Sequence, residues 1–165
     1  MKILEQGQVI VQKSKEPIQT ILGSCVSVAV FCTDTHLSGM NHFALPFQGN
    51  AVDMPERYGI HAMEYLLNEL YKKGARKSAL RVLYAGGACL RDSKYRIGYQ
   101  NIGFVEDFCQ TESLKIIFRD VGGFAGRRVV FKPLDTRLHI KLLNISGEGV
   151  EMFSLAQKNG VELFE

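Results

Sequence analysis

One cysteine and one histidine have the residue types and spacing of a nucleophile and its base. Cys25 follows a glycine and a serine, and the valines that come after it alternate with small residues, which predicts a strand. Small neighbours leave room around the thiol for a substrate and for backbone N–H groups. His42 follows at a distance that suits a strand, a turn at 33–35 and a returning strand. A thiol held beside an imidazole can become a thiolate, which is the nucleophilic form.

Two helices and several strands are expected around this pair. Residues 57–73 predict a helix because apolar residues, Tyr58 and Leu66 among them, recur every four positions, and Gly74 suits the position after its end. A second helix is expected over 101–109, with Asn101 as its N-cap. Strands are expected at 8–12, 18–22, 26–32, 37–45, 80–85, 115–118, 127–132 and 138–143, with a long loop at 46–55.

The order of these elements predicts the fold class. Strands flank both helices and several connections are short enough for hairpins, so we expect an α+β fold, an α/β layered arrangement with mixed β-sheets and two main helices. The length suits a single domain over 1–165. Residues 146–165 are interpreted as a possible C-terminal tail, with weak helical character at 150–158.

Composition excludes several classes of protein. A net charge of +3 with scattered Lys and Arg gives no reason to expect nucleic-acid binding. The chain starts without a secretory signal pattern and has no apolar run long enough for a membrane helix, which favours a cytoplasmic location. The four cysteines show neither a disulfide framework nor metal-ligand spacing. We therefore expect reduced thiols, no metal and no cofactor.

At the two reactive residues, the sequence resembles a known family. The segments Gly-Ser-Cys-Val-Ser-Val from 23 and Gly-Met-Asn-His-Phe-Ala-Leu-Pro from 39 look like the signature segments of CheD, the chemoreceptor glutamine deamidase family of bacterial chemotaxis. Further similar blocks follow in the same order and extend the resemblance over roughly 18–142: Arg-Tyr-Gly from 57, Gly-Gly-Ala from 86, Ile-Gly-Tyr-Gln-Asn from 97, Asp-Val-Gly-Gly from 120 and Gly-Arg-Arg-Val from 126.

The resemblance implies a fold like that of cysteine hydrolases and toxin deamidases, and an activity. Cys25 would attack a receptor glutamine and form a thioester, with His42 as acid and base. The family is understood to orient its histidine with a threonine just upstream of the cysteine. Thr20 is our choice for this role, and Gln19 is the alternative. The implied partners are cytoplasmic domains of methyl-accepting chemoreceptors. The protein would be peripheral to the membrane only through these receptors.

The remaining site residues and functions are less determined. Backbone N–H groups around Cys25 could form an oxyanion hole, with Ser24 or Asn41 as a side-chain donor. Ser24 and Ser27 are candidate substrate contacts. The alternative function is a regulatory binding partner of a CheC-type phosphatase of CheY, which would not require the cysteine or the histidine. A papain-like protease is a distant third, because His42 follows Cys25 too closely.

Overall fold

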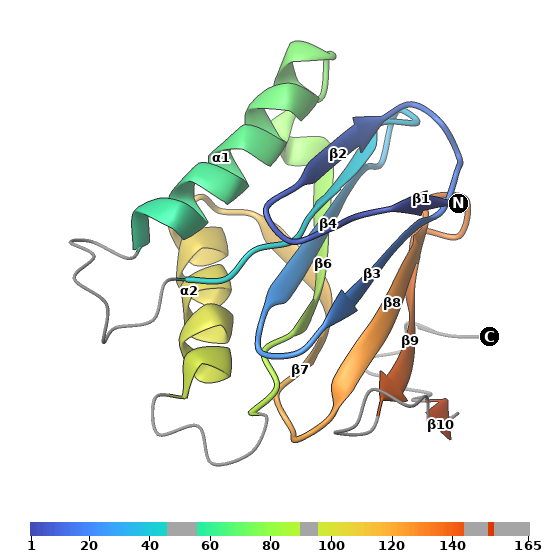
Figure 1. The fold of residues 1–165 in the computed structure, drawn as a ribbon. Coiled ribbons are helices and arrows are strands. Elements are labelled where there is room, and N and C mark those ends of the chain that lie inside the picture. Colours follow the sequence, from blue (N-terminus) through green and yellow to red (C-terminus); the bar gives the residue numbers. More distant parts are fainter. Residues whose placement is uncertain (46–55, 90–95, 144–151, 154–165) are drawn as a thin grey trace.

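The computed structural model describes residues 1–45, 56–89, 96–143 and 152–153, and the elements form three layers (Figure 1). Two helices cover one face of a middle sheet, and a second sheet covers its other face. This arrangement confirms the predicted α+β class with mixed sheets and two main helices. The expected loop at 46–55 and most of the expected tail lie outside the described residues.

The middle sheet carries the segment that follows Cys25. Its central strand is buried on both faces, as the run of valines and small residues predicted. Val28 and its alternate neighbours face the helices, whereas Ala29 faces the outer sheet. Only the pair formed by the last two strands in the sheet is parallel. The sheet order is β2 (Val9–Gln12), β5 (Ser38–Asn41), β4 (Val26–Cys32), β6 (Leu80–Gly86) and β7 (Lys115–Val121).

The outer sheet contributes β3, the strand before Cys25. Its order is β1 (Lys2–Ile3), β3 (Ile18–Leu22), β8 (Gly126–Lys132), β9 (Arg137–Leu143) and β10 (Met152–Phe153). The first pair is parallel and the others are antiparallel. Pairing with β9 makes Met152–Phe153 a strand, so the expectation of helix there was wrong for these two residues.

Helix α1 (Glu56–Lys72) packs on the middle sheet, and its orientation corrects one prediction. Leu66 is fully buried, as expected, but Tyr58 is 58% exposed. The buried stripe runs through Met63, Leu66 and Leu70, and the four-residue recurrence leaves this stripe toward its N-terminal end, where Tyr58 lies. Gly74 has φ of 103° and ends the helix as predicted.

Helix α2 (Ile97–Thr111) begins earlier than predicted. The preceding residue, Arg96, has left-handed backbone angles and occupies the N-cap position. Asn101 therefore lies inside the helix and is not its N-cap. Its side chain is fully buried, which leaves it available for contacts with the rest of the fold.

Two of the places where the chain crosses between the sheets are adjacent to each other. Residues 23–25 lead from β3 to β4, and residues 122–125 lead from β7 back to β8. The second crossing is bonded to the end of β6 by the N–H of Gly122, which donates to the carbonyl of Gly86 (3.0 Å). Cys25 thus lies where the chain passes from one layer to the next. Among the described helices, none is long and apolar enough to cross a membrane.

Candidate active site

Strand pairing places Cys25 and His42 on one face of the middle sheet. Strands β4 and β5 are antiparallel, and a further bridge joins Val26 to Phe43. The same register puts His42 opposite Ser27, so His42 and Cys25 are diagonal neighbours on the face toward the outer sheet. The returning strand ends at Asn41, earlier than predicted, but the expected juxtaposition of the two residues is present.

Thr20 reaches the imidazole from the outer sheet. Its Oγ1 lies 2.7 Å from Nδ1 of His42 and 2.7 Å from the carbonyl oxygen of Leu4. A hydroxyl has one proton, and the Leu4 carbonyl can only accept it, so Nδ1 of His42 must carry a proton and donate to Thr20. The other ring nitrogen, Nε2, is then left as a base. Gln19 projects from the opposite side of β3, so the structure favours Thr20 over Gln19 as the orienting residue.

Three consecutive backbone carbonyls hold the nucleophile loop at residues 23–25 in place. Gly23 accepts from the N–H of Ala88 (3.0 Å), Ser24 from Nδ2 of Asn101 (2.7 Å) and Cys25 from the N–H of Gly87 (2.8 Å). The N–H of Cys25 lies beside its own sulfur, where it lowers the thiol's pKa. This N–H is therefore a donor placed next to the atom that would attack a substrate.

Asn101 connects the two halves of the site. While its Nδ2 holds the carbonyl of Ser24, its Oδ1 accepts from the N–H of Leu45 (2.8 Å), three residues beyond His42. One buried amide thus bonds both the nucleophile loop and the segment that follows the base. Sequence reasoning missed this role because it assigned Asn101 to a helix cap. The signal in the sequence was that Asn101 is the last residue of the family-like block at 97–101.

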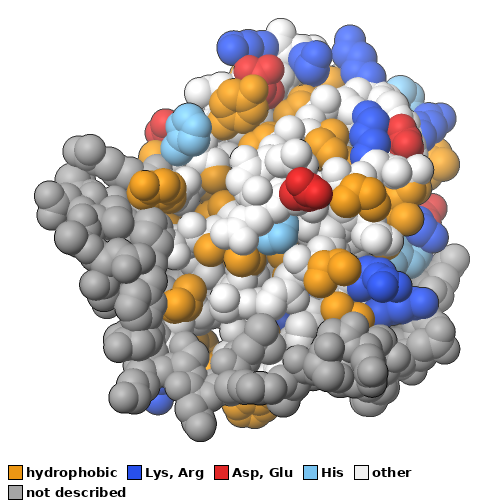
Figure 2. All heavy atoms as spheres, in the orientation of Figure 1, with side chains coloured by type: hydrophobic (Ala, Val, Ile, Leu, Met, Phe, Trp, Pro, Cys, Tyr) orange, Lys and Arg blue, Asp and Glu red, His pale blue; other side chains and the backbone are white. Residues whose placement is uncertain are grey.

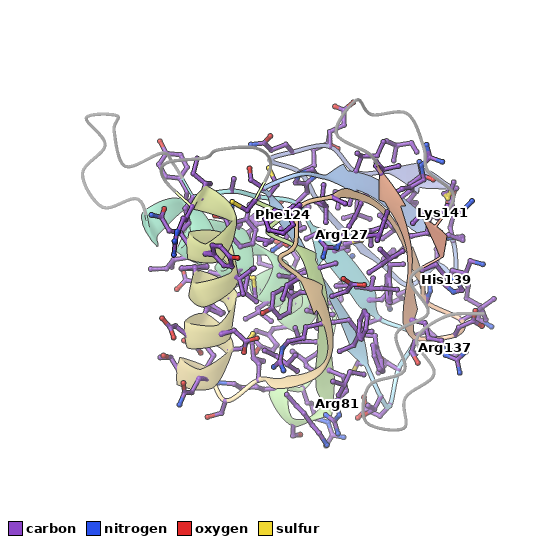
Figure 3. The ribbon with its side chains drawn as sticks, turned by 90° about the horizontal axis from the view of Figure 1, so that it is seen from below. Arg81, Phe124, Arg127, Arg137, His139 and Lys141 are labelled. Atoms are coloured by element: carbon purple, nitrogen blue, oxygen red, sulfur yellow. The ribbon has the colours of Figure 1, made fainter. Side chains whose placement is uncertain are left out.

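Gly86 and the buried ion pair between Arg127 and Asp120 support the nucleophile loop. A side chain at Gly86 would collide with the carbonyl oxygen of Cys25, and the residue has φ of 116°. Arg127 reaches inward from β8 and, unlike Arg137, lies away from the outer margin (Figure 3). Its Nη2 lies 3.0 Å from Oδ1 of Asp120, and its Nη1 donates to the carbonyl of Gly86 (3.5 Å). The ion pair therefore joins the blocks at 120–123 and 126–129 next to Gly86, which contacts the nucleophile loop.

Two of the expected substrate contacts are engaged inside the protein. Asn41 faces the helices, where its Oδ1 accepts from the N–H of Val28 (3.0 Å) and its Nδ2 donates to the carbonyl of Ala62 (3.3 Å). Ser27 is fully buried and its Oγ donates to the carbonyl of Asn41 (2.5 Å). Both residues support the sheet and neither can contact a substrate, which corrects their assignment. Ser24 is half-buried beside Cys25 and remains a candidate.

Burial favours the neutral form of both groups. Desolvation raises the pKa of the Cys25 thiol, and the nearby N–H of Cys25 offsets only part of this effect. Desolvation also lowers the pKa of His42, although the carbonyl of Leu4 acts in the other direction. A raised thiol pKa and a lowered imidazole pKa both disfavour a thiolate–imidazolium pair in the free protein. The geometry instead suits proton transfer during attack.

The comparisons with known proteins identify the family. The family model described as CheD chemotactic sensory transduction matches residues 44–142. The chain belongs to the CheD family. It is 40% identical over 143 residues to a protein of Hydrogenovibrio crunogenus, covering 84% of this chain and 75% of that one. It is also 36% identical to proteins of Caulobacter sp. strain K31 (89% and 80% covered) and Vibrio vulnificus strain CMCP6 (86% and 70%). All three are named probable chemoreceptor glutamine deamidase CheD.

The CheD match and the geometry identify different parts of the site. Asn101 and the Arg127–Asp120 pair lie within the matched range, whereas Thr20, Cys25 and His42 precede it. Strand register and hydrogen bonds are what bring these three residues together.

The other cysteines of this CheD chain have different surroundings. Cys32 and Cys109 are buried, and burial raises the pKa of Cys109 to about 12. Cys89 is half-buried, like Cys25, and so offers a matched control. Within the described residues, no group of three His, Cys, Asp or Glu side chains could hold a metal ion.

Proposed function

We propose that this protein is a chemoreceptor glutamine deamidase, which converts receptor glutamine side chains to glutamate and ammonia. The activity is the one named for its curated relatives. The observation that carries the proposal is the hydrogen bond between Thr20 and His42, because it leaves Nε2 as a base beside Cys25. A structural cysteine would need no such histidine.

In the acylation step, Nε2 of His42 removes the thiol proton as Sγ of Cys25 attacks the amide carbonyl carbon. The negative charge that develops on the carbonyl oxygen is stabilised by the N–H of Cys25. The C–N bond then breaks, and His42 returns the proton to the departing nitrogen. Ammonia leaves and a γ-glutamyl thioester remains on Cys25.

In the deacylation step, His42 removes a proton from water, and the resulting oxygen attacks the thioester carbonyl. The C–S bond breaks, the product leaves as glutamate, and His42 reprotonates Cys25. The two steps consume one water and need neither a redox partner nor a cofactor. Thr20 acts in both steps by holding His42 in one tautomer.

The decisive experiment is mass spectrometry of a receptor cytoplasmic fragment incubated with the protein. Deamidation adds about one dalton at a glutamine, because an amide becomes an acid. Cys25→Ala should lower the rate by at least about 10³-fold. Cys89→Ala, which removes a thiol of similar exposure, should retain wild-type activity. Deamidation by Cys25→Ala at the wild-type rate would show that the nucleophile is assigned wrongly.

The finer assignments follow from the same proposal. Because the proposed substrates are cytoplasmic domains of receptors, the protein would act in the cytoplasm and would meet the membrane only through those receptors. We also propose that residues 1–165 form a single domain. The CheD resemblance also supports docking to a CheC-type phosphatase. Because docking does not require the thiol, Cys25→Ala should still bind such a phosphatase. If Cys25→Ala lost both deamidation and phosphatase binding, the two roles would not be separate.

A further inference from the structure

Helix α1 exposes aromatic side chains beside the catalytic histidine. Tyr58 is 58% exposed and Tyr65 is 49% exposed, although both belong to a helix that packs on the core. Residues seven apart lie on the same side of a helix, about 10 Å apart along its axis. His61 lies between them, with its ring centroid 6.2 Å from that of Tyr65. Together the three form a continuous aromatic ridge, which we call the tyrosine ridge.

The tyrosine ridge is one wall of a cavity of about 630 Å³. The opposite wall is the segment 6–10, which includes the start of β2, and His42 and Ala44 lie between the two walls. The strand register that pairs Val26 with Phe43 places Ala44 opposite Cys25. Cys25 itself does not line the cavity, but His42 does, so the cavity ends beside the site of the proposed chemistry.

The described residues that line this cavity include no Lys, Arg, Asp or Glu. Figure 2 shows Lys and Arg gathered along the upper and right margins of the face instead. A charged side chain would lose its hydration in such a groove without gaining a partner. A neutral glutamine amide and apolar neighbours would not suffer this cost, so the chemistry of the walls suits an unreacted glutamine more than a glutamate.

We propose that the groove between the tyrosine ridge and β2 receives the chemoreceptor segment that carries the target glutamine. Tyr58 and Tyr65 are then specificity-determining residues that hold the substrate while its glutamine reaches Cys25. This inference rests on the proposed deamidase function and adds the surface and the side chains that the substrate contacts.

The groove also accounts for release of the product. Deamidation creates a carboxylate at the end of a cavity whose walls offer no cation among the described residues. The modified segment should therefore bind more weakly than the unmodified one. A receptor fragment with glutamate in place of the target glutamine should compete poorly for the enzyme.

The test compares Tyr58→Ala and Tyr65→Ala with Ile60→Ala. Ile60 is 39% exposed on the same helix and does not line the cavity, so it controls for truncating an exposed side chain of α1. Each tyrosine variant should raise KM for a receptor cytoplasmic fragment roughly tenfold, while Ile60→Ala matches wild type. Alkylation of Cys25 by iodoacetamide should proceed at the wild-type rate in all three variants. Tyr58→Phe, which keeps the ring, should restore most of the affinity.

Several outcomes would overturn the proposal without affecting the deamidase assignment. An unchanged KM in both tyrosine variants would show that the receptor docks elsewhere. A slower alkylation of Cys25 would show that the tyrosines support the catalytic residues instead. A dimer of the protein alone that Tyr58→Ala dissociates would assign the groove to a second copy. Failure of the proposed deamidase function itself would be seen separately, as no gain of about one dalton in a receptor fragment incubated with the wild-type protein.

Discussion

The proposed nucleophile and the proposed base of this site are held by different means. Cys25 is positioned through its backbone, because the carbonyls of the 23–25 loop are bound by Ala88, Asn101 and Gly87. His42 is positioned through its side chain, by one hydrogen bond to Thr20 from the other sheet. The first arrangement is part of the fold, whereas the second is a single contact across two layers.

This difference separates effects on stability from effects on catalysis. Removing a bond that holds the loop leaves buried polar groups without partners and also changes the course of the chain. Removing the bond to His42 leaves the chain in place but frees the imidazole to rotate and to exchange tautomers. Substitutions that remove the contact of the base should therefore lower activity more, and substitutions that remove contacts of the nucleophile loop should lower stability more.

Among the substitutions that remove a supporting contact of either half, Thr20→Val should have the largest effect on activity, because it keeps the shape of the side chain and removes the hydroxyl. We expect kcat to fall about 10²-fold, because the tautomer with a free Nε2 is no longer favoured. The free energy of unfolding should fall by about 1–3 kcal/mol, because the carbonyl of Leu4 loses its donor. Steady-state kinetics and urea unfolding measure the two quantities.

Thr20→Ser is the matched control, because it retains the hydroxyl that accepts from His42. It should keep most of the wild-type kcat. If Thr20→Val is as active as Thr20→Ser, the hydrogen bond to His42 does not orient the base, and the contrast between the two halves fails.

A smaller loss of activity and a larger loss of stability are expected from Asn101→Ala. The substitution leaves the carbonyl of Ser24 and the N–H of Leu45 without their partner. Unfolding should become about 1–3 kcal/mol easier for each unpaired group, and kcat should fall about tenfold as the loop shifts. Asn101→Asp should be worse in stability, because it buries a carboxylate against the carbonyl of Ser24. A stable Asn101→Ala protein with wild-type kcat would contradict this account.

The smallest effect is a dependence of stability on pH. The folded-state pKa of His42 lies below 6.5, so as the pH falls through 6.5 the unfolded chain binds a proton that the folded protein does not. His42 therefore makes the protein less stable on acidification. Cys25 has the opposite range, because its raised pKa lowers stability only as the pH rises above 9.0.

Urea unfolding of wild type and His42→Asn near pH 7.5 and near pH 5.5 measures this contribution. The wild type should lose more stability between the two than His42→Asn does. Equal losses would show that burial does not disfavour the charged imidazole, and that the base is less enclosed than the structure indicates.

The errors made from sequence have local causes. Asn101 has the residue type of an N-cap, but Arg96 adopts left-handed angles and the helix starts before it. Tyr58 recurs at helical spacing with Leu66, but a four-residue recurrence drifts around a helix and leaves the buried stripe before it reaches Tyr58. Asn41 is adjacent to His42, and strand alternation therefore directs it to the opposite face.

By itself, the sequence determined which residues could react and which strands carry them. Alternation around Val26 and the spacing to His42 were enough to predict a hairpin, because both are properties of neighbouring residues along one chain. Only the tertiary structure shows that Thr20 contacts the imidazole while Gln19 lies on the other side of β3, and that Asn101 bonds two separate segments. Those contacts join the two sheets, or a helix and two loops, and strand register and layer packing set their partners. Contacts between residues so far apart in the sequence cannot be predicted from a local sequence pattern.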